Sequence, residues 1–216
     1  MVYTDGACIN NGDKNTAAGL GIWYGENDPR NVSMRVPHKT QSNQTGELLA
    51  ILIAIRNHPP QEDVLIVSDS RYVIDGLTKN ARRWEERNWI DTQHGPVFKC
   101  ITAWMRWREG KTSLKWVKGH SGVTGNEGAD KLAGEGALKP DTDTYLTLDP
   151  PDTVPTGAAI QKLEQRDFYD IIVGMKRIPV RSKTVRNVEN IKACIKETVT
   201  NSSFTHQNRK TLLRDS

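Results

Sequence analysis

Four acidic residues stand where a fold could bring their carboxylates to one point. Asp5 ends an apolar opening, Glu47 begins an apolar helical run, Asp69 ends an aliphatic run, and Asp130 lies among small and acidic residues. Carboxylates packed together repel one another and raise one another's pKa unless cations neutralise them. Because oxygen ligands suit Mg²⁺ or Mn²⁺ better than Zn²⁺, the four acids predict a divalent-metal site.

Each acid also has a purely structural explanation. Asp5 and Asp69 could accept hydrogen bonds at strand ends, and Glu47 could favour the start of a helix. The joint case is stronger, because an open α/β sheet has its chemistry at the ends of adjacent strands. From the residues alone, a metal site and a set of structural carboxylates both stay open.

The elements that must position these acids follow from hydrophobic spacing. Strands are expected at 1–8, 17–24, 31–36, 64–68 and 114–118, and the fourth is the continuous aliphatic run of a buried parallel strand. Helices are expected at 45–57, 70–79, 96–108 and 126–137. Three strands followed by helix, strand, helices, strand and helix predict an α/β fold with a mixed sheet and helices on both faces.

The sequence changes in character after residue 137. Residues 138–157 contain four prolines and predict a linker that follows a domain at 1–137. Residues 158–216 predict a C-terminal extension of unknown function, partly helical and ending in a polar, basic, disordered segment. Amphipathic helices are expected within it at 159–175 and 183–199.

Composition limits the function classes. The 216 residues are 36% hydrophobic and 26% charged, as in ordinary globular proteins, and no run approaches the roughly 18 apolar residues of a membrane span. The opening residues lack the basic and apolar regions of a signal peptide. Cys8, Cys100 and Cys194 are odd in number and widely spaced. This pattern favours reduced thiols in the cytoplasm or nucleus over a disulfide scaffold or a zinc cluster.

Charge is unevenly distributed, although the net charge is only +4. Residues 79–118 hold ten Lys or Arg against four Asp or Glu, and residues 176–216 hold ten against three. An acidic stretch at 138–175 separates them, with three basic residues against seven acidic ones. Basic blocks often meet phosphates, and a solvated surface explains either block alone equally well.

Four strings follow one another in order: Tyr3-Thr-Asp-Gly-Ala-Cys, Asn43-Gln-Thr-Gly-Glu-Leu-Leu-Ala, Val67-Ser-Asp-Ser-Arg-Tyr-Val and Trp116-Val-Lys-Gly-His-Ser-Gly-Val-Thr-Gly-Asn-Glu-Gly-Ala-Asp-Lys-Leu-Ala. Over residues 1–137 they resemble type 1 ribonuclease H, in the form carried by retroelements. Ordered motifs are far more specific than one short motif. The resemblance implies a ribonuclease H-like five-stranded mixed sheet flanked by helices, and hydrolysis of the RNA strand of RNA–DNA hybrids.

The resemblance also implies a role for each acid. Asp5 would bridge two Mg²⁺ ions, or Mn²⁺ in their place, with Glu47 and Asp69 on one ion and Asp130 on the other. Two-metal chemistry fits independently, because such a pair activates a water and stabilises both oxygens of an in-line displacement. His120, in a glycine-flanked loop, would assist proton transfer or product departure, work that suits a near-neutral pKa.

To cut RNA and spare DNA, such an enzyme must detect 2′-hydroxyl groups. Asn43 and Gln44 match positions that do this in the family, and Cys8 and Asn11 lie in the corresponding first-strand turn. Ordinary turn chemistry is the alternative for the asparagines.

The tryptophans suggest how a DNA strand would be held. Trp84 and Trp89 are the candidates for stacking, since the string around them resembles the start of a substrate-binding protrusion of some family members. Phe98, Trp104 and Trp107 recur at helical spacing and are expected in the core.

Three functional hypotheses follow. The first is a hybrid-cleaving endoribonuclease, and because the first strand begins almost at Met1, we expect a trimmed domain or part of a longer retroelement polyprotein. The second is a catalytically inactive domain of the same fold that only binds nucleic acid, which the presence of every expected acid and of His120 disfavours. The third is a related DNA-cutting transferase, against which the Asn43-Gln44 pair and the His120 loop speak.

Overall fold

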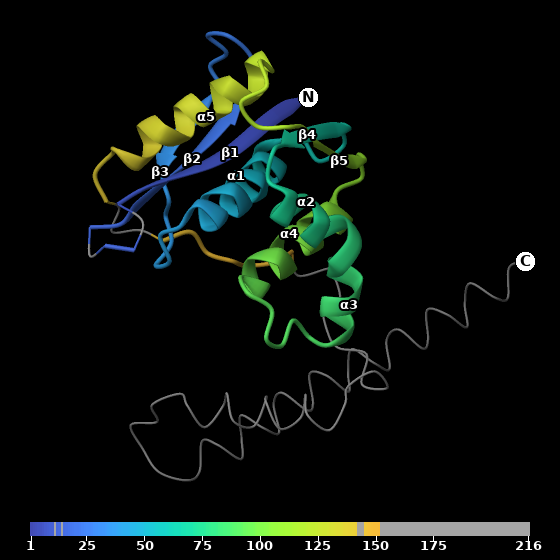
Figure 1. The fold of residues 1–216 in the computed structure, drawn as a ribbon. Helices are drawn as coiled ribbons and strands as arrows, with labels where there is room; N and C mark the ends of the chain where they lie inside the picture. Colours follow the sequence, from blue (N-terminus) through green and yellow to red (C-terminus); the bar gives the residue numbers. More distant parts are fainter. Residues whose placement is uncertain (11, 14, 142–144, 152–216) are drawn as a thin grey trace, which may run out of the picture. The chain divides into compact units, whose positions relative to one another are not determined.

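The computed structural model describes residues 1–10, 12, 13, 15–141 and 145–151, and five strands make up its sheet (Figure 1). The strands are β1 (Val2–Ile9), β2 (Ala17–Trp23), β3 (Val32–Arg35), β4 (Val64–Ser68) and β5 (Thr112–Trp116). The helices are α1 (Asn43–Asn57), α2 (Arg71–Asp75), the π-helical turn η1 (Gly76–Asn80), α3 (Ala81–Glu86), α4 (Gly95–Trp107) and α5 (Thr124–Ala137). No helix in these described ranges is long and apolar enough to cross a membrane.

Two compact units divide the chain. Met1–Ala81 and Pro96–Val154 form the first unit, which contains the whole sheet, α1, α2, α5 and the four acids. Arg82–Gly95, with most of α3, belongs to the second unit. Each unit is therefore described by itself.

The sheet is mixed, with the strand order β3-β2-β1-β4-β5. β1 pairs antiparallel with β2 and parallel with β4, and β4 pairs parallel with β5. Tyr3 stands opposite Val67 in the β1–β4 register, so Asp5 and Asp69 follow two residues further along their chains. The predicted α/β class and mixed sheet are confirmed, and the register brings these two acids to the same level of the sheet.

The helices pack on opposite faces of the sheet. α5 covers β1, β2 and β3, and α1 packs against the other side of β1 and β2 (Figure 1). The approach of α5 depends on glycine, because a Cβ added at Gly21 would lie 2.1 Å from the carbonyl oxygen of Ala129. α1 is apolar on nearly all sides and fully buries Leu48, Ile51 and Ile55, as expected of a central helix.

Two elements differ from the sequence-based expectation. The expected helix at 70–79 is confirmed as helical, but it is not one regular α-helix: α2 widens into the π-helical η1 turn, and helical structure continues beyond the expected end in α3 to Glu86. The Thr78 hydroxyl donates to the carbonyl oxygen of Ile74 at 2.6 Å, a side-chain bond that commonly bends helices. β5 begins two residues earlier than expected, because its register with β4 starts at the pair Val64 and Thr112.

Part of the expected linker lies on the first unit. In residues 145–149, which we call the strap, the Leu146 N–H donates to the carbonyl oxygen of Pro37 at 2.8 Å. The carbonyl oxygen of Asp149 accepts a hydrogen bond from the indole N–H of Trp104 at 3.2 Å. The chain after α5 is thus tied to the domain over these residues. The extension expected at 158–216, with its two helices, lies outside the described residues.

Candidate active site

Asp5 is the buried centre of the acidic cluster. Its side chain shares the face of β1 that carries Tyr3, the face covered by α5, and is only 7% exposed. The N–H of Gly6 donates to Asp5 Oδ1 at 2.7 Å. The pKa of Asp5 is raised to about 8, mainly by burial; the nearby charges of Asp69, Asp130 and Glu47 add to the rise, and the Gly6 N–H opposes it.

Glu47 reaches the same place from near the start of α1. Ser42 caps this helix by accepting from the N–H of Thr45 at 3.1 Å. Gly6 lets β1 approach the helix, because a Cβ there would lie 2.3 Å from the Glu47 nitrogen. The Ser70 hydroxyl donates to the Glu47 carboxylate. Burial, the main cause, and a nearby carboxylate raise the pKa of Glu47 to about 7.

Asp69 is held between the end of β4, the loop after β5 and α5. The side-chain amide of Asn126 donates to Asp69 Oδ2 at 3.0 Å, and the indole N–H of Trp116 donates to the Asp69 carbonyl oxygen at 2.9 Å. A Cβ at Gly119 would lie 2.6 Å from Asp69 Oδ2, so the loop passes directly over this carboxylate. Asn126 was given no role by the sequence reasoning, although it stands within the Asp130 string.

Asp130 and His120 lie on the solvent side of the cluster. Asp130, on α5, is partly exposed, and His120 Nδ1 lies 4.0 Å from Asp130 Oδ2. The His120 side chain is 85% exposed, and its backbone has a positive φ of 48°. The loop therefore presents the imidazole to solvent beside the acids.

The structure thus brings the four predicted acids and His120 into one neighbourhood. No group of three or more His, Cys, Asp or Glu side chains within the described residues is arranged to hold a metal ion as it stands. One oxygen each of Asp5, Glu47 and Asp69 is instead engaged by a donor of the chain. The residue types fit Mg²⁺ or Mn²⁺, because every potential ligand atom of the four acids is an oxygen. Carboxylates that are buried close together also need a proton or a cation to offset their repulsion.

The predicted RNA-contact residues gather at the start of α1. Asn43 is exposed and Gln44 is half-buried there. The Asn43 backbone N–H faces the half-buried thiol of Cys8, whose pKa is raised by burial and lowered in part by that N–H. Asn11 lies outside the described residues. Cys8 and Asn43 therefore lie side by side, close to Glu47 along the helix.

The tryptophan predictions had mixed outcomes. In the second unit, Trp89 is 7% exposed and its ring centroid lies 6.1 Å from that of Trp84. The two rings therefore pack against each other. Stacking of Trp84 and Trp89 on DNA stays a prediction. In α4, Phe98 is fully buried as expected. Trp107 is 41% exposed, so its core assignment is wrong, because it packs edge-on against Trp104 at the end of the helix.

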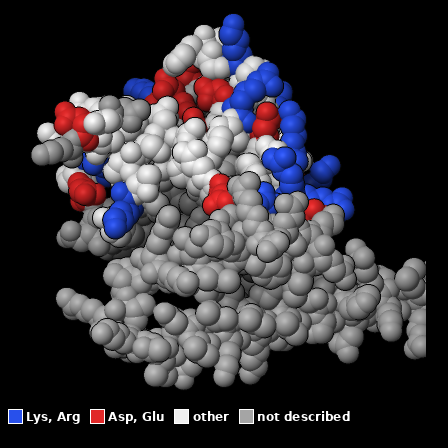
Figure 2. Space-filling view, turned by 60° about the horizontal axis from the view of Figure 1, so that its bottom comes forward, with Lys and Arg blue, Asp and Glu red and all other residues white. Residues whose placement is uncertain are grey.

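Charged side chains are grouped on the face drawn in Figure 2. Lys and Arg gather along one margin of this face, whereas Asp and Glu form small separate groups. The uneven charge of the sequence is therefore also uneven in space. Gathered basic side chains raise the local concentration of phosphate-bearing partners.

The fold and the cluster of acids define a class of α/β proteins with a carboxylate site at the end of a mixed sheet. The family model for RNase H matches residues 1–138. Ribonuclease H of Schizosaccharomyces pombe is 38% identical over 141 residues, 63% of this chain and 52% of that protein. Ribonuclease H1 of Homo sapiens is 36% identical, covering 63% of this chain and 49% of that protein. The chain belongs to the ribonuclease H family.

The relatives differ in how much of their length is matched. The chain spans about half the length of the yeast and human relatives, and 89% of the Ribonuclease H of Alcanivorax borkumensis, to which it is 34% identical. Among solved structures, the prototype foamy virus protease-reverse transcriptase has a TM-score of 0.54 at 24% identity, covering 65% of this chain and 21% of that chain. At this identity the likeness shows the fold.

Proposed function

We propose that this chain is an endoribonuclease that hydrolyses the RNA strand of RNA–DNA hybrids, using two divalent metal ions held by Asp5, Glu47, Asp69 and Asp130. The observation that carries the proposal is the burial of Asp5 among the other acids, which raises its pKa to about 8. Burying like charges costs free energy, and a bound cation removes that cost. Membership of the ribonuclease H family supports the class of reaction.

The donor set favours Mg²⁺, with Mn²⁺ as a substitute. When bound, such ions supply Lewis acidity and a water of lowered pKa. The chain itself orients the carboxylates, since Gly6 engages one oxygen of Asp5, Ser70 one of Glu47, and Asn126 one of Asp69. Fixed carboxylates reorganise little when a substrate arrives, which is the usual contribution of such supporting contacts.

His120 is proposed to carry protons to or from the reacting phosphate. Its imidazole is exposed to solvent beside the acids, and histidine is the side chain most often used to transfer protons in catalysis. His120 Nδ1 lies 4.0 Å from Asp130 Oδ2, so the imidazole stands next to an expected metal ligand, where a leaving oxygen would need a proton donor.

RNA selection is proposed for Cys8, Asn43, Gln44 and Asn11. Asn43 and Gln44 carry amide groups that both donate and accept hydrogen bonds, the combination that a 2′-hydroxyl also has. Their position at the start of α1, a few residues before Glu47, favours contact with the nucleotides next to the cleaved bond. A DNA strand lacks these hydroxyls and cannot form the same hydrogen bonds, which lowers its affinity.

Cleavage of an end-labelled RNA–DNA hybrid in Mg²⁺ tests the proposal, beside duplex RNA and duplex DNA. We expect cutting of the hybrid alone and its loss in Asp69→Asn. Glu109→Gln is the matched control, because Glu109 is an exposed acid outside the cluster. Cleavage retained by a folded Asp69→Asn protein would refute the metal-site assignment. Hybrid binding without cutting by the unchanged chain would instead support an inactive nucleic-acid-binding domain.

The cellular context belongs to the same proposal. We propose that the chain works on RNA–DNA hybrids in the cytoplasm or nucleus, as part of a longer retroelement polyprotein. The free thiols of Cys8 and Cys100 suit a reducing compartment. A transcript that joins this sequence in frame to a polymerase would support the context, and a self-contained transcript would contradict it.

A further inference from the structure

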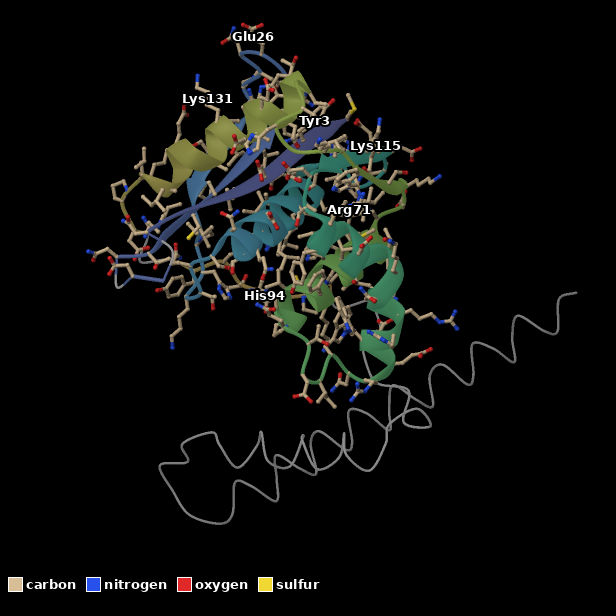
Figure 3. The ribbon with its side chains drawn as sticks, viewed as in Figure 1. Tyr3, Glu26, Arg71, His94, Lys115 and Lys131 are labelled. Carbon is tan, nitrogen blue, oxygen red and sulfur yellow. The ribbon has the colours of Figure 1, made fainter. Side chains whose placement is uncertain are left out.

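An arginine next to the acidic cluster is stacked on a tryptophan and otherwise unengaged. Arg71 opens α2 two residues after Asp69 and is exposed (Figure 3). Its guanidinium carbon lies 3.8 Å from the ring centroid of Trp116. In the described part of the chain, no hydrogen bond or ion pair engages its N–H groups. Stacking on the indole fixes the orientation of the planar guanidinium. The N–H donors along its edge stay accessible to solvent.

Trp116 is itself fixed to the backbone of the acidic site. It ends β5 opposite Ser68, and its indole N–H donates to the carbonyl oxygen of Asp69 at 2.9 Å. One indole ring therefore separates the Arg71 guanidinium from the Asp69 backbone. The neighbouring Lys115 is exposed on the other face of the strand, since successive residues of a strand point to opposite faces, and it does not share this position.

The positive charge of Arg71 is not used to neutralise the buried acids. Among the described residues, no ion pair joins its guanidinium to a carboxylate of the cluster. An exposed guanidinium that is held rigid, unpaired and beside an expected metal ligand is suited to an anion that comes from outside. The planar fork of arginine matches two oxygens of a phosphate.

We propose that Arg71, oriented by Trp116, is a positioning residue that binds one backbone phosphate of the RNA strand next to the bond that is cut. The inference rests on the proposed function, because it takes the RNA strand to be the one presented to Asp69 and its neighbours. Arg71 touches a phosphate that does not react, so it sets the register of the strand and leaves the chemistry to the acids.

Hybrid binding in EDTA tests this inference without turnover. Fluorescence anisotropy of a labelled hybrid is measured over a salt series for the unchanged chain, Arg71→Gln, Arg71→Lys and the control Lys111→Gln. Lys111 is exposed at the other end of β5, about 16 Å along the strand from Trp116. We expect Arg71→Gln to bind about three- to tenfold more weakly and to reduce the salt slope by about 0.9. Arg71→Lys should restore the slope but only part of the affinity, because lysine lacks the fork.

A walk of single neutral methylphosphonate linkages along each strand locates the phosphate. The unchanged chain should lose affinity at one RNA position near the cleavage site, and Arg71→Gln should be insensitive there while responding normally elsewhere. Three results would overturn the inference. Arg71→Gln could become insensitive at a position of the DNA strand, or the unchanged chain and Arg71→Gln could give identical profiles. Arg71→Gln could also lower the melting temperature and leave the salt slope of binding unchanged.

The two proposals fail separately in these experiments. A chain that binds hybrid but never cuts it in Mg²⁺ contradicts the proposed function, while the binding data still decide the role of Arg71. A chain that cuts hybrid with Arg71→Gln unchanged in KM and kcat contradicts the inference alone. If the inference holds, KM rises in Arg71→Gln and kcat changes less than about twofold, as expected when binding energy is lost equally from ground and transition states.

Discussion

Replacing Asp5 by asparagine should stabilise the fold in metal-free buffer, although it removes a central residue of the site. Asn imitates the protonated acid and keeps the oxygen that accepts from the Gly6 N–H. The pKa of Asp5 rises from an ordinary 3.8 to about 8 in the folded protein. At pH 7 the unfolded chain has released this proton, about three pH units above its pKa of 3.8, whereas the folded protein still holds it. At about 1.4 kcal/mol per unit, keeping the proton destabilises the folded state by at most about 4 kcal/mol. Relaxation around the charge lowers the expected gain to about 2–4 kcal/mol.

The sign of the pH dependence follows from proton binding. Between pH 3.8 and about 8 the folded protein holds a proton on Asp5 that the unfolded chain has released, so stability falls as the pH rises through this window. The Asp5→Asn variant lacks this contribution, and its advantage should be small near pH 4 and largest near pH 8. Urea denaturation in EDTA across this range measures it, with Glu109→Gln as the control. Parallel stability curves for the variant and the unchanged chain would refute the reasoning, as would a less stable variant.

Three further predictions concern packing and reactivity. Gly6→Ala should lower the unfolding free energy by about 3 kcal/mol or more and abolish cleavage, because its Cβ would lie 2.3 Å from the Glu47 nitrogen; a urea melt within about 1 kcal/mol of the unchanged chain would contradict this. Arg108→Met should cost about 3–5 kcal/mol in thermal melts, since buried Arg108 donates hydrogen bonds to four carbonyl oxygens around the end of α1; a normal melting temperature would argue against it. Peptide mapping after mild alkylation at pH 8 should find Cys8 modified before Cys100, whose pKa burial raises to about 11; equal labelling would be inconsistent with the fold.

Much of the fold was predictable because its signals are local. The aliphatic run of β4 and the apolar spacing of α1 depend on neighbours within one strand or helix, and both elements lie where they were expected. The acids were predictable for a different reason. Asp69 directly follows β4 and Glu47 lies near the start of α1, whereas Asp5 lies within β1 and not at the strand end that was expected; ordered motifs tied all three to one family.

The remaining features depend on contacts that no local pattern contains. Asn126 donates to Asp69 across 57 residues of sequence, and the bond becomes visible only when α5 lies beside the end of β4. Helical spacing correctly assigned Trp107 to a helix but said nothing of what lies opposite it, and its ring is largely exposed. The η1 turn was missed because its residues are individually compatible with an ordinary helix.

The strap has a consequence for how this family member can be trimmed and how its sequence can drift. Its bonds to the domain come from its own backbone: the Leu146 N–H, and the carbonyl oxygens of Thr147 and Asp149, which accept from the side chains of Arg56 and Trp104. Backbone groups are the same in almost every residue, so substitutions here should be tolerated where substitutions of Arg56 or Trp104 are not. An expression boundary at the end of α5 would strip both side chains of these acceptors, whereas one placed after residue 151 would keep them.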